Sequence, residues 1–390
     1  MPSGMETTKK SHHQPFADLP AALVDEVIAQ STQVGDQLIE NLGSFTKQRD
    51  SFRTSLQECG MLIHDSDYGY PPIPTTCGTD GSYGIERMLS VDLGASAAVA
   101  IEGLTPPSEK RHWQQPHHST FVVAEQHNVN TATILRSVML GRELILATQA
   151  PHDLIMLDGT LTLPIIYFNQ AINASANTTL QSSDEFLKHL YEYLTCYSEI
   201  LTSPRSDKNY IALPKYSTRR ELGKILKWPE TYDDRGLLTM ILNPGELTKV
   251  LHLEQPEQDW HFSIPKNIKK EIEIVCNSIV IELKNVCIFY YKPYSWLPVL
   301  RIELSRSIAN NRHRLATVIQ GIRHQCATPS MLEPYPVYMA DRTVKALAKA
   351  LPTFRHISTQ RVAEKHLGDI GDVFFAMHGY RSETGGKSHG

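Results

Sequence analysis

The sequence predicts an α/β or α+β fold, in which helices pack on a β-sheet and a helical arm precedes the sheet. Two observations predict the sheet. Short strand-like runs, "RMLSVDLG", "ASAAVAIEG" and "STFVVAEQ", come first, and a helix, the strand "DLIMLDGT" and an amphipathic helix then alternate. A third observation predicts the arm, because apolar residues recur every three to four positions from Phe16 onward.

The composition is that of a globular protein. The 390 residues are 41% hydrophobic and 21% charged, which allows a sizeable core. The six cysteines form no CxxC pair, which argues against a disulfide framework and a structural zinc site. The net charge of −4 gives no overall attraction to nucleic acid, so any DNA-binding surface must be local. Because the apolar runs are too short for a membrane span and the N-terminus lacks a signal sequence, we expect a cytoplasmic protein that contacts no membrane.

Changes in composition divide the chain into four parts. Residues 1–15 are polar and rich in His, Lys and Ser, as in a disordered tail. Residues 16–62 form the helical arm. The segment "YGYPPIPTTCGTDGS", rich in proline and glycine, marks the entry to the main domain, residues 63–360. Residues 361–390 are expected to be a C-terminal extension that ends in a flexible tail, "ETGGKSHG".

The second half of the main domain continues with strands and helices. "NYIALPKYS" predicts a strand that ends in a basic segment, and residues 233–253 predict a helix with a Pro-Gly interruption. The run "IEIVCNSIVIELKNVCIFYYKPYSWLPVLRIELS" predicts two or three strands. Two further helices are expected, in "ANNRHRLATVIQGIRHQC" and over residues 337–351.

One acid lies on the apolar face of the helix predicted over residues 131–150. Glu143 shares that face with three apolar residues at i, i+4 spacing: Leu135, Met139 and Ala147. A buried carboxylate is costly unless it is paired or binds a metal. Two interpretations therefore stay open for Glu143, a salt bridge to an arginine and a metal ligand.

Three more acids stand at comparable positions. Asp80 and Asp158 each precede a glycine, so a turn is the alternative interpretation of both. Asp341 shares a helix face with Val337 and Val344. Hard divalent cations take oxygen ligands from scattered carboxylates, and two such ions can activate a water molecule and stabilise the leaving oxygen in phosphodiester cleavage. Together the four acids indicate a metal-dependent nuclease.

The order and spacing of these acids also match a known family. Asp80 in "TDGS", Glu143 in "GRELILA" and Asp158 in "MLDGTL" resemble the NurA nucleases. Further segments are similar to motifs of that family: "YIALPKYSTRRELGKIL", "DDRGLLTMILNPGEL", "LPVLRIELS" and "EPYPVYMADRTVKAL". The resemblance covers residues 75–351. It departs from the family in the last motif, where Glu333 stands in place of a tyrosine and Asp341 in place of a histidine.

The resemblance implies an RNase H-like fold, a mixed β-sheet flanked by helices, and makes residues 63–360 a NurA-like nuclease domain. It implies a homodimeric DNA nuclease that uses two Mn²⁺ (or Mg²⁺) ions, as an endonuclease on single strands and as a 5′–3′ exonuclease. The implied partner is a HerA-type hexameric ATPase that translocates DNA, in DNA end resection and repair or in phage defence. The altered last motif leaves an alternative, a catalytically weakened scaffold subunit that docks on the translocase.

The resemblance also implies roles for the site residues. Asp80 would bridge the two metal ions, with Glu143 and Asp158 completing one site and Asp341 the other. The basic turn would act on the substrate: Lys215, with Arg219 or Arg220, would contact the DNA backbone or the developing negative charge. A solvated basic turn is the alternative interpretation of these three residues.

Other patterns favour structural roles. Arg301 and Glu303 alternate on one strand face, so we expect them to pair with each other. Asp92 and Gly94 resemble the first phosphate loop of actin-like ATPases, but the second and third motifs of those proteins are missing, so we interpret Asp92 as a strand residue of a hairpin. The 17 histidines have no metal-binding spacing and are expected at the surface.

Overall fold

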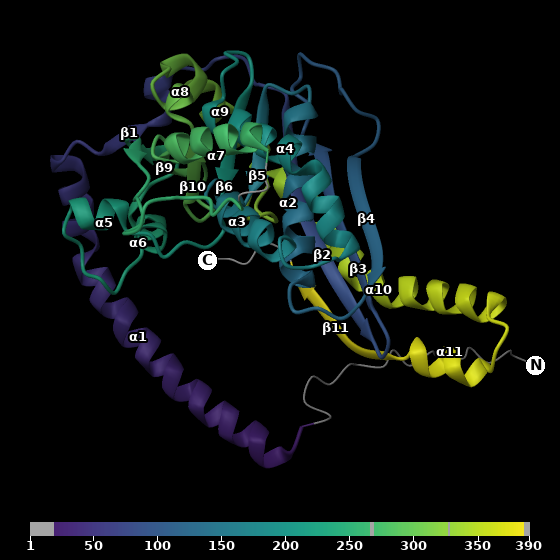
Figure 1. Cartoon of the computed structure of the whole chain (residues 1–390). Coiled ribbons are helices and arrows are strands. Elements are labelled where there is room, and N and C mark those ends of the chain that lie inside the picture. The colour runs from purple at the N-terminus through teal and green to yellow at the C-terminus, as the bar shows by residue number, and fades with distance from the viewer. Residues whose placement is uncertain (1–18, 266–268, 327, 386–390) are drawn as a thin grey trace, which may run out of the picture. The chain divides into compact units, whose positions relative to one another are not determined.

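The computed structural model describes residues 19–265, 269–326 and 328–385. Within these residues, eleven strands form one β-sheet that contains parallel and antiparallel pairs. Helices flank this sheet (Figure 1). The expectation of a mixed sheet flanked by helices is therefore confirmed. The tail expected over residues 1–15 lies outside the described residues.

The centre of the sheet has an RNase H-like strand order. β2 (Thr76–Met88), β3 (Asp92–Glu102) and β4 (His117–Glu125) form an antiparallel meander. The chain then passes through α2 (Thr131–Gln149) to β5 (Leu154–Asp158), which pairs in parallel with β2, and β6 (Asn209–Leu213) pairs in parallel with β5. In the resulting order, β4-β3-β2-β5-β6, only β3 runs against the other strands. This central unit is the RNase H-like core that the resemblance implies.

The interpretation of Asp92 as a strand residue of a hairpin is correct. Asp92 begins β3 and is paired in register with Arg87 of β2. Its buried carboxylate forms an ion pair with the Arg87 guanidinium at 2.6 Å. Asp92 thus stabilises the β2–β3 hairpin.

Beyond β6 the sheet continues with antiparallel strands. In spatial order they are β10 (Leu300–Leu304), β9 (Cys287–Lys292), β7 (Glu246–Thr248) and β1 (Leu62–His64), while the short β8 (Leu251–His252) pairs with β9. A 3-10 helix, η1 (Asp65–Tyr68), follows β1.

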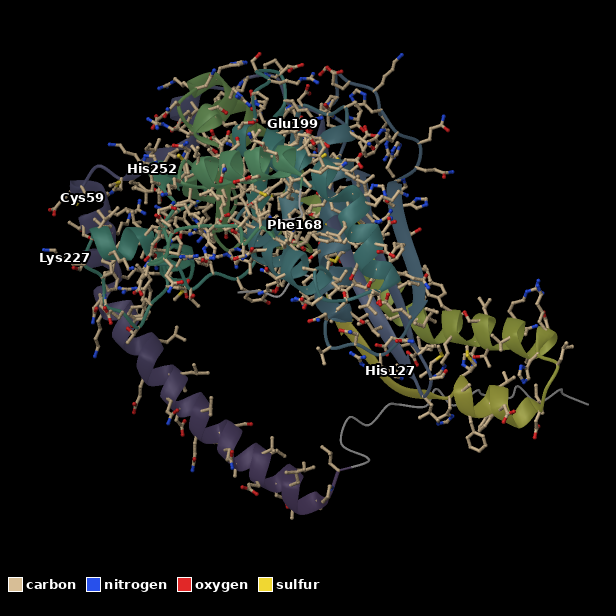
Figure 2. All side chains as sticks on the ribbon, viewed as in Figure 1. Cys59, His127, Phe168, Glu199, Lys227 and His252 are labelled. Atoms are coloured by element: carbon tan, nitrogen blue, oxygen red, sulfur yellow. The ribbon has the colours of Figure 1, made fainter. Side chains whose placement is uncertain are left out.

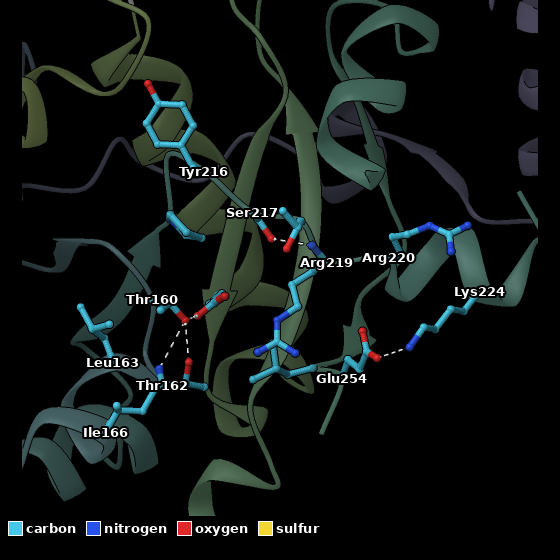
Figure 3. Close-up of a pocket in the computed structure, with 14 residues that line it drawn as sticks. Thr160, Thr162, Leu163, Ile166, Tyr216, Ser217, Arg219, Arg220, Lys224 and Glu254 are labelled. Atoms are coloured by element: carbon cyan, nitrogen blue, oxygen red, sulfur yellow. Dashed lines mark hydrogen bonds and ion pairs between the residues drawn. The ribbon is translucent and has the colours of Figure 1, made fainter. Parts of the chain in front are cut away.

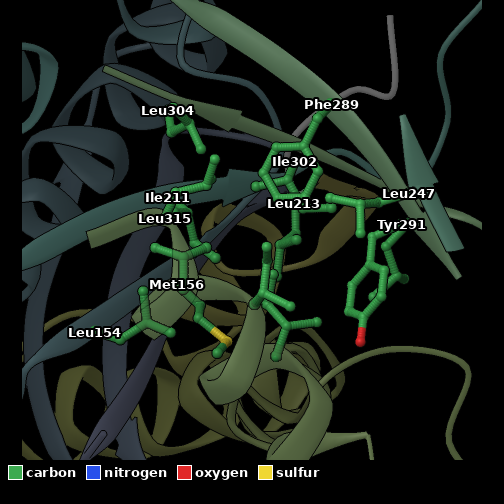
Figure 4. Packing of buried hydrophobic residues seen from close by; sticks show 14 of the residues in the cluster. Leu154, Met156, Ile211, Leu213, Leu247, Phe289, Tyr291, Ile302, Leu304 and Leu315 are labelled. Carbon is green, nitrogen blue, oxygen red and sulfur yellow. The ribbon is translucent and has the colours of Figure 1, made fainter. Parts of the chain in front are cut away.

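A hydrophobic core fills the space between this half of the sheet and α9 (Arg312–Gln325). Alternate residues of β5, β6, β9 and β10 face it because side chains on a strand alternate between the two faces (Figure 4). Its strand members include Leu154, Met156, Ile211, Leu213, Phe289 and Ile302, and Leu315 and Ile319 are members from α9. Each fully buried side chain of this size stabilises the fold by about 1.5–3 kcal/mol.

The remaining helices complete the layers around the sheet. They are α3 (Leu163–Ser175), α4 (Gln181–Thr202), α5 (Glu221–Ile225), α6 (Asp234–Ile241), α7 (Lys270–Leu283), α8 (Arg306–Ala309), α10 (Tyr335–Lys365) and α11 (Ile370–Ala376). Phe168 of α3 stacks on Tyr193 of α4 with ring centroids 6.2 Å apart. Phe168 is fully buried, and Figure 2 labels it among the other side chains of this region.

The helix α7 corrects one prediction. The run "IEIVCNSIVIEL" was expected to be a strand because it is rich in β-branched residues, but Lys270–Leu283 is helical. Its buried residues, Ile272, Cys276, Ile279 and Leu283, are spaced by four, three and four positions, which is the helical period. Packing of this one face outweighs the strand preference of the individual residues.

The C-terminal region also differs from the prediction. The helix expected over residues 337–351 is longer, since α10 continues to Lys365. The tail from Glu383 is expected to be flexible, but its first three residues belong to β11 (Gly379–Gly385), which pairs with β2 in antiparallel orientation, and its residues 386–390 lie outside the described residues. The backbone of β2 provides this pairing, and the polar sequence of β11 shows no strand pattern of its own.

The helix α1 (Ala21–Glu58) lies within the range expected for the arm. The chain divides into two compact units inside this helix, between Thr54 and Ser55. The apolar residues that predict the arm are 45–55% exposed: Leu23, Val27, Val34, Leu38 and Leu42. None of the described helices is both long and apolar enough to cross a membrane.

Candidate metal centre

Three of the four predicted acids lie together. Asp80 of β2, Asp158 at the end of β5 and Asp341 of α10 each place a carboxylate oxygen within 4.8 Å of the other two. Asp80 and Asp158 are buried, and Asp341 is more accessible. Like charges this close repel one another, so a cation placed among them would stabilise the cluster.

The register of two parallel strands brings Asp80 and Asp158 together. Thr79 of β2 pairs with Leu157 of β5, so the two aspartates are the next residues along these neighbouring strands. Gly159 follows with a φ of 88°, a left-handed conformation that suits glycine, and turns the chain away from the sheet. Asp158 thus ends a strand at a turn, as expected, whereas Asp80 lies inside β2 and the turn interpretation of Asp80 is wrong.

The third acid reaches the cluster because a glycine admits α10. A Cβ atom on Gly78 would lie 2.4 Å from the carbonyl carbon of Pro336, in the first turn of α10. Only glycine therefore allows this close approach of the helix to β2. Asp341 stands five residues beyond Pro336 on the same helix. The sequence shows that Gly78 stands two residues before Asp80. It does not show that α10, much later in the chain, packs against this glycine.

The amine of Lys215 lies among the carboxylates. Its Nζ atom is 3.0 Å from Asp158 Oδ2 and 3.4 Å from Asp341 Oδ1. Burial alone would lower the pKa of Lys215, but the negative charges of Asp158, Glu333 and Asp341 outweigh it and raise that pKa well above its ordinary value. Lys215 therefore carries a fixed positive charge inside the cluster.

Glu333 has a partner in the site, although its sequence position left its role open. Its carboxylate Oε2 lies 3.1 Å from Lys215 Nζ. Burial raises the pKa of Glu333, and the charge of Lys215 opposes that rise. Where the resembled family has a tyrosine, this chain thus adds a third carboxylate around the same lysine.

Glu143 is buried as predicted but is not one of the three clustered acids. Leu135, Met139, Glu143 and Ala147 form one face of α2 and are at most 1% exposed. The hydroxyl of Thr79 donates to Glu143 Oε1 at 3.3 Å. Because successive residues of a strand face opposite sides, Thr79 and Glu143 lie on the other face of β2 from Asp80. Glu143 and Asp158 nevertheless line one small cavity.

The two arginines of the basic turn have different surroundings. The Arg220 guanidinium donates to the carbonyl oxygens of Trp228 at 2.6 Å and Tyr232 at 3.1 Å, so it holds the local backbone. Arg219 lines a cavity next to this turn. A solvated turn is therefore the wrong interpretation of Arg220. The structure gives Arg219 and Arg220 different surroundings, which the sequence alone did not distinguish.

Arg301 and Glu303 pair with each other as expected, at 3.1 Å. The third member of this group has no local signal in the sequence. Glu221 of α5 accepts two hydrogen bonds from the same guanidinium, at 2.7 and 2.8 Å. All three side chains are at most 3% exposed. Arg301 therefore pairs with two buried carboxylates and links α5 to β10, the strand next to β6.

No protein-family model and no curated protein sequence matches this chain. Solved structures do match it. The NurA nuclease from Sulfolobus solfataricus has a TM-score of 0.55 and 16% identity, over 87% of this chain and 98% of that one.

This chain has a NurA-like fold. A structure of NurA with manganese matches with a TM-score of 0.51 and 14% identity, over 86% of this chain and 98% of that one. Another NurA structure matches with a TM-score of 0.50 and 14% identity, over 87% and 99%. The similarity in fold that the sequence motifs imply is therefore confirmed, and it extends over nearly the whole length of the matched structures.

The acids of this NurA-like chain fit a hard divalent cation. Mg²⁺ and Mn²⁺ favour carboxylate oxygens, and Asp80, Asp158 and Asp341 supply three of them from separate elements. No histidine or cysteine belongs to the group found in the described residues, so the donor set is entirely oxygen.

One histidine lies far from the surface, contrary to the prediction. His152 is 1% exposed and packs edge-on against Trp113, with ring centroids 4.6 Å apart. It precedes β5, at the opposite end of that strand from Asp158. Burial lowers the pKa of His152 to about 4. His152 is thus a neutral core residue of the NurA-like sheet and is separate from the acid cluster.

Proposed function

We propose that this chain is a metal-dependent deoxyribonuclease, a phosphodiester hydrolase. The observation that carries the proposal is the convergence of Asp80, Asp158 and Asp341 from β2, β5 and α10. The NurA-like fold supports it, and one protein of similar fold was crystallised with manganese. A carboxylate cluster in this position suits phosphodiester cleavage, because the reaction needs an activated water and a stabilised leaving oxygen.

Asp80, Asp158 and Asp341 would hold Mn²⁺ or Mg²⁺, and we propose two ions. When bound, the ions supply an activated water and neutralise charge on the phosphate. In this scheme Asp80 would contact both ions, with Asp158 at one and Asp341 at the other. Glu143 is proposed as a further ligand because it lines the same cavity as Asp158.

Lys215 is proposed to hold the acids in place and to contact the substrate. Its ammonium group lies within 3.4 Å of Asp158 and Asp341, so it orients both carboxylates. A protonated amine at this position can also donate to a phosphate oxygen as negative charge develops there. Glu333 would help to position Lys215, with its carboxylate 3.1 Å from the amine.

The finer functional assignments rest on the family resemblance. We propose that the protein cleaves single-stranded DNA internally and digests strands from 5′ to 3′. We further propose that it acts in the cytoplasm as a homodimer with a HerA-type hexameric ATPase. DNA end resection in repair and phage defence are the two settings that this partnership suggests.

The test is cleavage of single-stranded DNA by the purified protein, with and without Mn²⁺ and the translocase. We expect Mn²⁺-dependent cleavage by the wild type and at least a hundredfold loss in Asp80→Ala. Asp207→Asn is a matched control, since Asp207 is an exposed acid that pairs with Arg205 before β6. Equal cleavage by Asp80→Ala would contradict the assignment. Absence of cleavage by all three proteins, even with the translocase, would favour the scaffold alternative.

A further inference from the structure

A cavity of about 510 Å³ is lined by residues that follow closely in sequence on those of the proposed metal centre (Figure 3). One wall begins with Thr160, two residues after Asp158, and another includes Pro214 and Tyr216, the two chain neighbours of Lys215. Because β5 and β6 are parallel neighbours, the loops after them leave the same edge of the sheet. The cavity is therefore built from the same two loops that present Asp158 and Lys215.

Among the residues that the structure describes, three basic side chains line this cavity, and only that of Arg219 is left to bind a ligand. Lys224 pairs with Glu254, and the Arg220 guanidinium is bound to backbone carbonyl oxygens. Within the described parts of the chain, the Arg219 guanidinium makes no hydrogen bond or ion pair. In Figure 3 its side chain lies in the middle of the group of lining residues.

Glu303, one of the two acids that line this cavity in the described chain, is already bound by other groups. Glu303 Oε2 accepts hydrogen bonds from the Thr160 hydroxyl at 2.6 Å and from the Leu161 amide at 2.9 Å. Its other oxygen pairs with Arg301. The positive charge of Arg219 is therefore not cancelled by Glu303, and it favours an anionic ligand.

The remaining surface suits a nucleotide better than a bare phosphate. Leu163 and Ile166, in the first turns of α3, form an apolar wall together with Leu253. Hydroxyl groups of Thr162, Ser217 and Thr218 also line the cavity. An apolar wall can take a base or a sugar, hydroxyls can donate to phosphate oxygens, and an arginine binds phosphate with two parallel hydrogen bonds. The volume lies within the range of small-molecule sites.

We infer that this cavity binds the nucleotide adjacent to the scissile phosphate of the DNA strand, and that Arg219 contacts the phosphate of that nucleotide. The inference rests on the proposed nuclease function. It assigns different roles to adjacent arginines: Arg219 binds substrate and Arg220 stabilises the turn. It also places the substrate strand along the edge of the sheet at which β5 and β6 end.

The test is binding of a 20-nucleotide single strand, measured by fluorescence anisotropy in EDTA over a series of salt concentrations. Arg219→Gln should weaken binding roughly tenfold, as expected for loss of a charge-assisted hydrogen bond. Loss of one phosphate contact should also reduce the slope of log affinity against log salt by about 0.7. Arg205→Gln is the charge-matched control, because Arg205 is exposed at the opposite end of β6 and should leave the slope unchanged.

Competition separates a nucleotide site from a phosphate site. Thymidine 5′-monophosphate should displace the strand from the wild type more strongly than inorganic phosphate does, and Arg219→Gln should lose this difference. Equal competition by the two compounds would overturn the nucleotide assignment. A melting temperature of Arg219→Gln equal to that of the wild type shows that the cavity is folded.

Parallel assays of Mn²⁺-dependent cleavage keep this inference distinct from the proposed function. If the wild type cleaves DNA and the salt slopes of Arg219→Gln and the wild type agree, the cavity inference fails while the nuclease proposal stands. If the slopes differ but the wild type does not cleave, the nuclease proposal fails and Arg219 remains a contact to the strand.

Discussion

Lys215 Nζ lies 3.0 Å from Asp158 Oδ2, so the amine that follows β6 neutralises the carboxylate that ends the neighbouring parallel strand β5. The same amine contacts Glu333 and Asp341. One lysine thus lies within ion-pair distance of three acids, which stand at the end of β5, just before α10 and within α10. Metal binding and folding stability should therefore depend on the same residue.

Replacing Lys215 tests this dependence. Lys215→Met leaves Asp158, Glu333 and Asp341 without their shared cation, and we expect a loss of about 2 kcal/mol in the free energy of unfolding. Lys215→Arg keeps the charge and should lose less. Urea denaturation in EDTA measures both variants. Added Mn²⁺ should restore part of the stability of Lys215→Met, since the ion supplies positive charge to the same acids; an equal deficit with and without Mn²⁺ would argue against a shared site.

The role of Glu143 can be separated from its packing. Glu143→Gln keeps the shape of the side chain and the oxygen that accepts from Thr79, but removes the negative charge. If Glu143 is a metal ligand, the Mn²⁺ concentration for half-maximal cleavage should rise roughly tenfold, with little change in melting temperature. Asp80→Asn serves as the comparison for loss of a clustered acid. An unchanged Mn²⁺ requirement would leave Glu143 with a structural role only.

Removal of the buried guanidinium should destabilise the fold. Arg301→Met leaves Glu221 and Glu303 buried without their cation, and a loss of about 3–5 kcal/mol in the free energy of unfolding is expected. The midpoint of urea denaturation measures this loss. Arg205→Met is a control, because that arginine pairs with Asp207 at the surface and should change stability by less than about 1 kcal/mol. Similar midpoints for the two variants would show that the buried group contributes no more than a surface pair.

His152 should make stability depend on pH in the acid range. Burial lowers its pKa in the folded protein to about 4, whereas an unfolded chain has the ordinary value of 6.5. Between these values the unfolded chain takes up a proton and the folded chain does not, so stability is present above pH 6.5 and is lost as the pH falls toward 4. The loss is on the order of 3 kcal/mol.

His152→Phe, which keeps an aromatic ring beside Trp113, removes this proton uptake. Denaturation of the variant and the wild type at pH 7, 5.5 and 4.5 provides the comparison. The difference between them should grow in favour of the variant as the pH falls. Parallel curves would show that the His152 ring titrates equally in both states.

Residues with local signals were predictable from the sequence. The helical period identified Glu143 as an inward-facing acid, because Leu135, Met139 and Ala147 share its face and all are buried. The order of strands, a helix and a further strand predicted the kind of sheet, but the first predicted run spans the turn between β2 and β3, and β2 itself was not predicted. Asp-Gly marked the turn after β5 correctly, but the same dipeptide at Asp80 lies inside a strand, since a turn signal can be overridden by long-range pairing.

Features that depend on distant contacts were not predictable. The glycine at position 78 matters only because Pro336 lies against it, and nothing in the neighbouring sequence indicates that contact. The strand identity of β11 comes from the available edge of β2. A single sequence also cannot show which basic side chain is already paired, so Lys215, Arg219 and Arg220 looked alike although each has different surroundings.

The strand that carries Asp80 changes its partner close to that residue. On one edge, β5 pairs with Thr76–Thr79 and β11 pairs with the far end of β2. β11 is the last of the described elements. Residues 83–88 of β2 therefore lack this partner strand during translation until residues 379–385 have been made. Open edges recruit foreign strands, so a stalled or truncated chain would be prone to aggregate. The three acids can meet only after residue 341 has been made, so the order of synthesis delays assembly of the candidate metal centre.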